Sequence, residues 1–237
     1  MRMQDKKNRP GPSTSLTVEA LGPFKFYQSA DGHRLTTDSV LLADFVLGAD
    51  GVSACRFNRV ADLGAGTGAV TLMIAAREQA ASFTCFEIDP SLAGLARRNI
   101  EENGLEGRVE VAEGDLRSRC LEYPVGSFSL VVSNPPYVKE GAGRVSPMPE
   151  RAVARSERMC PLTGLITAAS HLAGAKGRAA FVYPARRLDE MLEELGRAGL
   201  KALRLRFVHT KGGKAAKLFM VEAGRTGELK VEEPLFL

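Results

Sequence analysis

Short apolar runs alternate with amphipathic stretches along most of this chain. The apolar runs end at glycine, proline or polar residues, as is typical of strands buried in a sheet, and they predict strands at 59–64, 83–88, 109–112, 128–132 and 178–183. Apolar residues three or four positions apart predict helices at 69–77, 162–173 and 188–198, and one more that begins at Pro90. Strands that alternate with helices predict an α/β fold, with a mostly parallel sheet and helices on both faces.

The N-terminal part of the chain departs from this alternation. Residues 1–14 are polar and basic and predict a flexible arm, whereas residues 22–28 alternate as in a short strand. A helix with an apolar side follows, and either Thr37 or Asp38 is expected to cap its start.

The C-terminal part predicts an antiparallel hairpin, with strands at 200–209 and 217–223 joined by a glycine-containing turn. We therefore expect three parts: the arm at 1–14, an N-terminal extension at 15–50 and one main domain at 51–237. No internal repeat interrupts this organisation.

The composition is that of an ordinary globular protein, with 237 residues of which 44% are hydrophobic and 25% charged. The net charge of +4 permits a polyanionic partner but becomes informative only where the charge is localised. Four widely spaced cysteines and three histidines indicate neither a disulfide framework nor a metal site. No apolar stretch has the length of a signal peptide core or a membrane span, so we expect a cytoplasmic protein without a membrane partner.

A glycine-rich loop follows the strand at 59–64. Asp62 ends the apolar run, and Gly64, Gly66 and Gly68 lead into the next helix, where they let the backbone turn tightly and a ligand approach closely. The following strand ends at Glu87, where a carboxylate is the usual partner of ribose hydroxyls. This order predicts a site for a nucleoside-containing cofactor.

The sequence after the strand at 128–132 predicts a second kind of chemistry. Asn134 offers an amide oxygen, Pro135 and Pro136 leave backbone carbonyls without competing N–H groups, and Tyr137 adds a flat ring. These groups suit a planar amino group, because acceptors can hold its hydrogens while a ring stacks on its face. A strand end followed by a simple Pro-Pro turn is the alternative interpretation.

Basic residues gather in two places after this motif. The long segment at 138–160 contains Lys139 and Arg144, and its position beside the motif favours a docking loop. No acidic residue lies between Leu195 and Val221, and the hairpin turn within that run carries Lys211, Lys214 and Lys217. These lysines are candidate contacts to phosphates of a nucleic acid, although such runs are often only a solvated face.

Taken together, these motifs resemble the class I S-adenosylmethionine-dependent methyltransferases, and in particular the small amino-methyltransferases with an Asn-Pro-Pro-Tyr motif. Within that class the chain is similar to bacterial enzymes that methylate the N6 atom of an adenosine beside the anticodon of valine tRNA, because residues 36–42 look like a segment typical of them. The resemblance covers roughly residues 20–225. It implies a Rossmann-like sheet, S-adenosylmethionine as the cofactor and an RNA partner, which for these enzymes is tRNA.

The resemblance also assigns roles to individual residues. It implies catalysis by Asn134, Pro135, Pro136 and Tyr137. It implies cofactor binding by Thr37, Asp38, Asp62, Gly64, Gly66, Gly68, Glu87, Ile88, Asp115, Leu116 and Asn134. No metal is expected, and a monomer is the favoured state.

Three alternatives remain at this point. A protein glutamine amide presents the same planar amino group, so it could replace adenine as the substrate. A nicotinamide-dependent oxidoreductase would also use the glycine loop, but it leaves the Asn-Pro-Pro-Tyr motif unexplained. An RNA-binding module with a degenerate cofactor pocket is disfavoured, because Asp62, Gly64, Gly66 and Glu87 are all intact.

Overall fold

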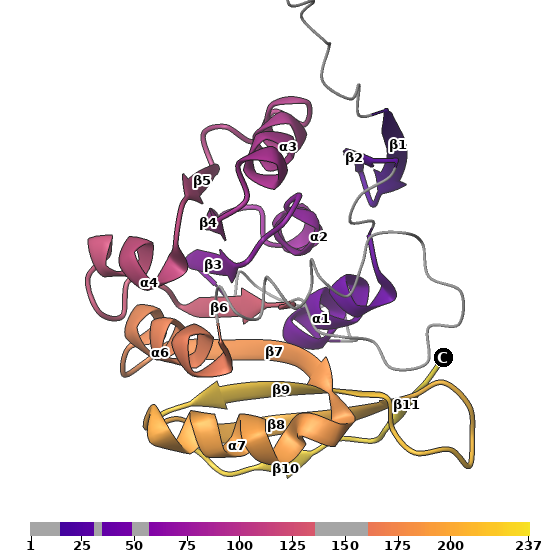
Figure 1. Cartoon of the computed structure of the whole chain (residues 1–237), viewed down its shortest axis with the longest axis vertical. Helices are drawn as coiled ribbons and strands as arrows, with labels where there is room; N and C mark the ends of the chain where they lie inside the picture. Colours follow the sequence, from indigo (N-terminus) through magenta and orange to yellow (C-terminus); the bar gives the residue numbers. More distant parts are fainter. Residues whose placement is uncertain (1–14, 31–34, 49–56, 136–160) are drawn as a thin grey trace, which may run out of the picture.

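The computed structural model describes residues 15–30, 35–48, 57–135 and 161–237 (Figure 1). Several predicted features lie outside these residues, namely the arm at 1–14, Pro136, Tyr137, Lys139 and Arg144.

One large sheet runs through the molecule. Within the described residues its strands are β3 (Arg59–Leu63), β4 (Ser82–Glu87), β5 (Val109–Glu113), β6 (Leu130–Ser133), β7 (Arg178–Pro184), β8 (Lys201–His209), β9 (Leu218–Gly224), β10 (Lys230–Val231) and β11 (Leu235–Phe236). Their order is β10-β8-β9-β7-β6-β3-β4-β5, and β11 also pairs with β8. Strands β3 to β7 are parallel to their neighbours in that set, while β9 runs antiparallel to β7 and β8. The predicted α/β fold, mostly parallel with a C-terminal antiparallel hairpin, is confirmed.

The chain order reverses between β3 and β6, which lie side by side in the sheet. From β3 the chain proceeds outward to β4 and β5, then returns to β6 on the other side of β3. In doubly wound sheets, ligands bind outside the carboxyl ends of the strands at such a switch point. The glycine loop after β3 and Asn134 after β6 both lie at this point.

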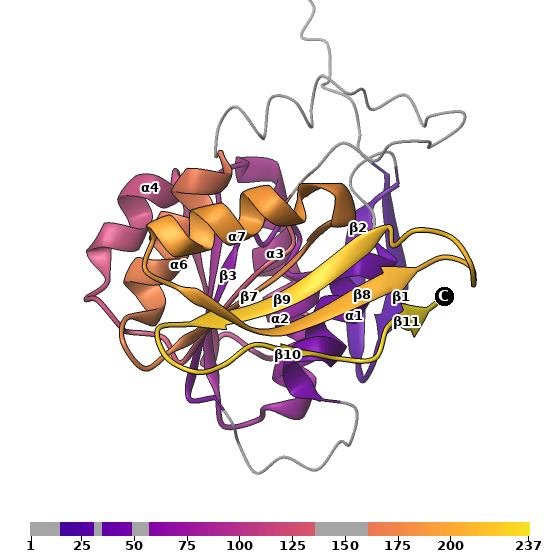
Figure 2. The same ribbon diagram turned by 90° about the horizontal axis from the view of Figure 1, so that it is seen from below.

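Helices cover both faces of the sheet (Figures 1 and 2). The helices are α1 (Thr37–Leu47), α2 (Ala69–Arg77), α3 (Pro90–Glu101), α4 (Leu116–Arg119), α6 (Leu162–Ala173) and α7 (Leu188–Arg197), with short 3-10 turns η1 (Cys120–Glu122) and η2 (Ala185–Arg187). Helices α1, α2 and α3 lie on one face, and α4, α6 and α7 lie on the other. In the part of the chain that is described, no helix is long and apolar enough to cross a membrane.

A continuous apolar core fills the space between the sheet and its helices. Phe83, Phe86 and Phe128 are almost wholly buried in one half of the sheet, and Phe181 and Phe219 occupy the other. Fully burying a Phe side chain contributes roughly 1.5–3 kcal/mol. The two halves of the sheet are therefore held together by the same packed core that positions the strand ends.

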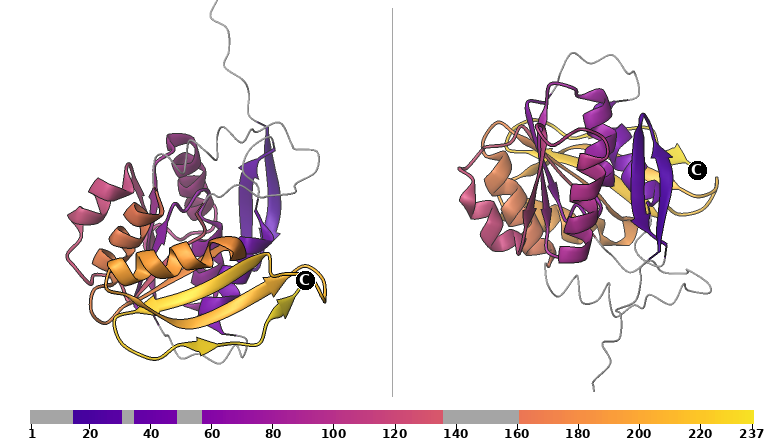
Figure 3. Two further views of the ribbon diagram at one scale, coloured as in Figure 1. Left: turned by 60° about the horizontal axis from the view of Figure 1, so that its bottom comes forward. Right: turned by 90° about the horizontal axis from the view of Figure 1, so that it is seen from above.

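The hairpin of β1 (Leu16–Leu21) and β2 (Phe24–Ser29) lies outside α2 and α3, away from the main sheet (Figure 3). Helix α3 supplies hydrogen bonds to it through two asparagines. Asn103 accepts from the Lys25 N–H (2.9 Å) and donates to the Lys25 carbonyl (2.8 Å), and Asn99 does the same for Tyr27 (2.7 and 3.0 Å). Residues four apart in a helix are separated by about 6 Å along the axis, close to the roughly 6.7 Å between alternate residues of a strand. The two asparagine side chains of α3 thereby form the hydrogen bonds to the β2 backbone that a third strand would form.

Two details differ from the sequence-based expectations. The residue at the N-cap of α1 is Thr36, whose side chain makes no capping hydrogen bond, so the N-cap predicted at Thr37 or Asp38 is wrong by one or two positions. The strands β1, β10 and β11 were not expected. Most side chains of β1 are exposed, and β10 and β11 have only two residues each, so none of the three carries a burial pattern that could be read from the sequence.

Candidate active site

The glycine loop between β3 and α2 has a backbone that requires glycine. Gly64, Gly66 and Gly68 have φ values of 69°, 58° and 84°, a region that other residues rarely adopt. The N–H groups of Gly64 and Ala65 both donate to the Phe86 carbonyl (2.8 and 3.0 Å), which holds the loop against the end of β4. A Cβ added at Gly64 or Gly66 would meet no atom within 4 Å, so the loop borders open space that a ligand can enter.

Glu87 lies at the carboxyl end of β4 and faces this loop. Its Oε2 accepts a hydrogen bond from the Gly66 N–H (2.7 Å), and its Oε1 accepts one from the Asp89 N–H (2.8 Å). The side chain is largely buried, and this burial raises the pKa of Glu87, although the backbone N–H groups of Asp89 and Gly66 partly offset the effect. The N–H groups of Gly66, Ile88 and Asp89 thus fix the orientation of the carboxylate, which keeps at least one lone pair for a ligand hydroxyl.

Asp62 is buried at the end of β3, with 2% of its surface exposed. Its Oδ2 accepts from both the N–H (3.2 Å) and the hydroxyl (2.8 Å) of Thr71 in α2. Burial raises the pKa of Asp62 to about 7, even though the bonds from Thr71 act in the opposite direction. Asp62 therefore links β3 directly to α2, the two elements that the glycine loop joins.

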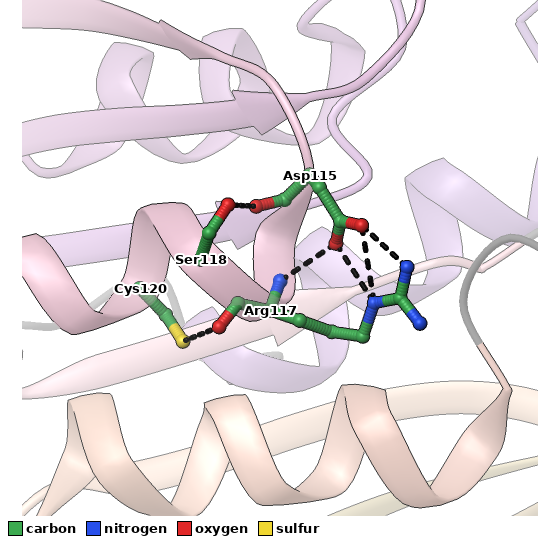
Figure 4. Close-up of polar contacts among 4 residues, drawn as sticks. All are labelled: Asp115, Arg117, Ser118 and Cys120. Atoms are coloured by element: carbon green, nitrogen blue, oxygen red, sulfur yellow. Dashed lines mark hydrogen bonds and ion pairs between the residues drawn. The ribbon is translucent and has the colours of Figure 1, made fainter.

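Asp115 follows β5 and caps the start of the short helix α4. Its carboxylate accepts the Arg117 N–H (2.9 Å) and is bound side-on by the Arg117 guanidinium, with Nε 3.0 and 3.1 Å from the two oxygens (Figure 4). The hydrogen bonds from Arg117 lower the pKa of Asp115, so the group is ionised at neutral pH. Ile88, which is 38% exposed, and the buried Leu116 lie beside these acids at the same edge of the sheet.

Asn134 comes directly after β6 and is held by the first turn of α1. Its Nδ2 donates to the Ser39 Oγ (2.9 Å), and Ser39 is itself buried. The neighbouring Ser133 donates from its Oγ to the Leu63 carbonyl (2.6 Å), which joins the ends of β6 and β3. With its Nδ2 engaged, the Asn134 amide has its Oδ1 on the opposite side, where it can accept a hydrogen bond.

The N-terminal hairpin also reaches the glycine loop. Asn99 is fully buried, and besides bonding Tyr27 its Nδ2 donates to the Thr67 carbonyl (2.9 Å) inside the loop. One amide side chain therefore connects the hairpin, helix α3 and the candidate cofactor loop.

The predicted site residues thus divide into two groups. The glycine loop, Glu87 and Asp115 lie together at one end of the sheet edge, and the start of α1, which carries Thr37 and Asp38, contacts Asn134 through Ser39. Pro135 follows Asn134 and is half-buried, whereas Pro136 and Tyr137 lie outside the described residues.

The acid-free run at 195–221 does not form one basic surface. Arg197 pairs with Glu193 and Glu194, while Arg204 pairs with Glu222 and Glu232. These four glutamates lie outside residues 195–221, so the sequence of the run alone did not show that its arginines have acidic partners. Its lysines at 211, 214 and 217 are exposed.

Sequence reasoning missed three polar residues of this region. Ser39, Asn99 and Arg117 each bond a predicted site residue or the glycine loop. Asn99 could have been found, because it occupies the apolar side of α3 between Ala96 and Ile100. The Ser39 bond joins residues 95 positions apart, so no local pattern indicates it.

Comparison with known proteins gives a consistent result. The family model described as the methyltransferase small domain matches residues 40–167. A Porphyromonas gingivalis protein named tRNA1(Val) (adenine(37)-N6)-methyltransferase is 34% identical over 201 residues, covering 84% of this chain and 77% of its own. A protein of the same name from Actinobacillus pleuropneumoniae is 31% identical over 206 residues, covering 84% and 81%. A solved Agrobacterium tumefaciens structure, described as a predicted O-methyltransferase, is 26% identical with a TM-score of 0.62 and covers 84% of this chain and 87% of its own.

Proposed function

The chain belongs to the methyltransferase small domain family, and we propose that it transfers a methyl group from S-adenosylmethionine to the exocyclic amino nitrogen of an adenine in tRNA. The observation that carries this proposal is the Asn134 amide, held by Ser39 at the sheet edge beside the glycine loop. The two curated relatives are named for adenine 37 of tRNA1(Val), and we propose the same position and tRNA for this chain.

The residues at the switch point fit S-adenosylmethionine. Open space borders Gly64 and Gly66, so a ligand can approach the loop backbone, and Glu87 can still accept a hydrogen bond from a ribose hydroxyl. Asp115 is an ionised carboxylate one strand further along the edge, in the place that the resemblance gives to the acid near the adenine of the cofactor. When bound, the cofactor supplies an electrophilic methyl group on a positively charged sulfur.

Asn134 and Pro135 supply what the accepting nitrogen requires. The amino nitrogen of adenine shares its lone pair with the ring, so two acceptors that hold its hydrogens favour electron density on nitrogen. The Asn134 Oδ1 and the Pro135 carbonyl are the two acceptors that we assign to this role. The nitrogen becomes acidic only as the new bond forms, so no strong base is needed beforehand, and its proton can pass to water.

The same argument separates this proposal from its alternatives. A hydroxyl acceptor, as in an O-methyltransferase, offers only one hydrogen and would leave one of the two acceptors unused. A nicotinamide-dependent oxidoreductase would have no use for Asn134 and is not supported by the relatives. A protein glutamine amide would satisfy the geometry, but the relatives are named for tRNA.

One experiment tests the substrate class directly. The protein is incubated with a labelled methyl donor and separate pools of tRNA, ribosomal RNA and total protein, with Asn134→Ala as the matched control. We expect label in tRNA, recovered as N6-methyladenosine after digestion, and only background with Asn134→Ala. Label in protein as N5-methylglutamine, or in RNA on a hydroxyl oxygen, would contradict the proposal.

A further inference from the structure

A cleft of about 650 Å³ lies beside the start of α1 and contains none of the glycine loop, Glu87 or Asp115, although Thr37 and Asp38, which the resemblance assigns to the cofactor, form one of its walls. It is lined by the first turn of α1, the end of β7 with the η2 turn, and the segment between β8 and β9. Thr37 and Asp38 line it, and the next residue, Ser39, binds Asn134. The candidate cofactor loop and acids follow β3, β4 and β5, whereas the cleft lies beyond β6, over β7, β8 and β9. Asn134 therefore stands between the candidate cofactor site and the cleft.

The charges along the cleft are predominantly positive. Arg186, Lys214 and Lys217 line it, against the single acidic side chain of Asp38, which is 7% exposed. Within the described residues neither lysine makes an ion pair, in contrast to Arg204, which is held between two glutamates. The lysines are thus available to a negatively charged group that enters from solvent.

The size and the remaining lining suit one nucleotide. A volume of 650 Å³ lies within the range of roughly 300–1,000 Å³ that is usual for small-molecule pockets. Apolar side chains of Leu35, Val208 and Leu218 and the small Ala215 and Ala216 complete the walls. Lysines position a nucleic acid by its phosphates, and apolar walls accept the face of a sugar or base.

We propose that this cleft holds the nucleotide of the RNA strand that adjoins the target adenine, with its phosphate on Lys214 and Lys217. The proposal rests on the function proposed above and specifies where the RNA strand runs. It also separates the three lysines predicted to contact RNA: Lys214 and Lys217 line the cleft and are assigned the phosphate, whereas Lys211 does not line it.

Filling the cleft tests the proposal. Ala215 is exposed, so Ala215→Trp places a large side chain in the cleft without disturbing the core. Ala80→Trp is the matched control, since Ala80 is an exposed residue in the turn before β4, at the opposite edge of the sheet. We expect kcat/KM for tRNA to fall at least about tenfold in Ala215→Trp and to stay at the wild-type value in Ala80→Trp. S-adenosylhomocysteine affinity should be the same in all three proteins, and an unchanged kcat/KM in Ala215→Trp would overturn the proposal.

Salt dependence of binding tests the phosphate contacts separately. The double substitution Lys214→Ala with Lys217→Ala removes only side chains, because the bonds of this segment to Val208 and His209 use backbone atoms of the two lysines. The slope of log affinity for tRNA against log salt should become flatter by about 1.4, at about 0.7 for each lost contact to single-stranded RNA. Lys201→Ala, an exposed lysine at the far end of β8, should keep the wild-type slope.

The two tests distinguish failure of this proposal from failure of the proposed function. If the wild-type protein methylates no tRNA, the proposed function fails, and the salt series still decides whether the cleft binds RNA. A wild-type slope in the double variant overturns the cleft assignment even if tRNA is methylated. Methylation of a glutamine peptide that is lost in Ala215→Trp would also overturn it, because the cleft would then hold a peptide.

Discussion

Removing the hydroxyl of Ser39 should weaken catalysis without weakening cofactor binding. The Ser39 Oγ accepts the only hydrogen bond that the Asn134 Nδ2 makes within the described residues, at 2.9 Å. Without it, the amide can rotate so that a donor, and not the Oδ1 acceptor, faces the amino group of the substrate. Ser39→Ala should therefore lower kcat while the geometry of the glycine loop stays intact.

The size of this effect follows from the kind of bond that is lost. A bond between two neutral groups contributes about 0.5–1.5 kcal/mol net. If that energy is lost from the transition state, kcat falls by about two- to twelvefold, at 1.36 kcal/mol for each factor of ten. The loss should be smaller than that of Asn134→Ala, which removes the acceptor itself.

The assay is kcat with saturating tRNA, together with the dissociation constant of S-adenosylhomocysteine by calorimetry. Ser170→Ala is the control, because Ser170 is also buried and lies far from Asn134, and the substitution removes at least as much bonding: a bond to the Ala198 carbonyl and one from the Arg225 guanidinium. Ser39→Thr keeps the oxygen and should restore most of kcat. In the Asn134→Ala background Ser39→Ala should cause no further loss, because the partner is already absent. Additive losses in that double variant would refute the positioning role.

Three further predictions concern the acids and the amide. Glu87→Ala should weaken S-adenosylhomocysteine binding about ten- to a hundredfold, since charge-assisted bonds to ribose hydroxyls contribute roughly 1.5–3 kcal/mol, and an unchanged calorimetric constant would exclude Glu87 from the site. Burial raises the pKa of Asp62 to about 7, so between about pH 4 and pH 7 the folded protein keeps a proton on Asp62 that the unfolded chain has released. The contribution of this group to the free energy of unfolding therefore falls as the pH rises through that range. The stability of Asp62→Asn relative to wild type, from urea unfolding, should therefore rise between about pH 4 and pH 7 and then level off; a difference that is independent of pH would contradict the shift. Asn134→Ala should lower kcat by about a hundredfold or more with unchanged cofactor affinity, and equal losses in both would indicate a structural role instead.

Elements whose side chains are buried on a regular period could be predicted from the sequence. Helices α2 and α6 have the predicted bounds, Ala69–Arg77 and Leu162–Ala173, because an apolar period and a neighbouring glycine or proline mark each one. The glycine loop and Asn134 were each predicted to follow a strand, and the structure brings them to one edge because parallel strands end together.

The features that escaped prediction depend on partners far apart in the chain. The charge of Arg204 is offset by Glu222 and Glu232, which lie 18 and 28 residues away, so a local count of charges overstated the basic surface. The cleft beside Asn134 is formed by the start of α1 and the β8–β9 segment, which are more than a hundred residues apart in sequence and meet only in the folded sheet. The spacing of apolar residues along the sequence carries no information about contacts between such distant segments.

The paired asparagines of α3 affect where this enzyme can be cut or fused. The family model starts at residue 40, so a truncation at that boundary would remove the hairpin and leave the amides of Asn99 and Asn103 without their partners in the hairpin backbone. Asn99 would lose both of its bonds to Tyr27 and keep the one to the Thr67 carbonyl, and each lost bond between neutral groups costs about 0.5–1.5 kcal/mol net, beside the glycine loop. The hairpin looks like an appendage in sequence, yet Asn99 connects its backbone to the glycine loop, so we expect a truncated protein to need the residues from at least Lys25 onward for activity.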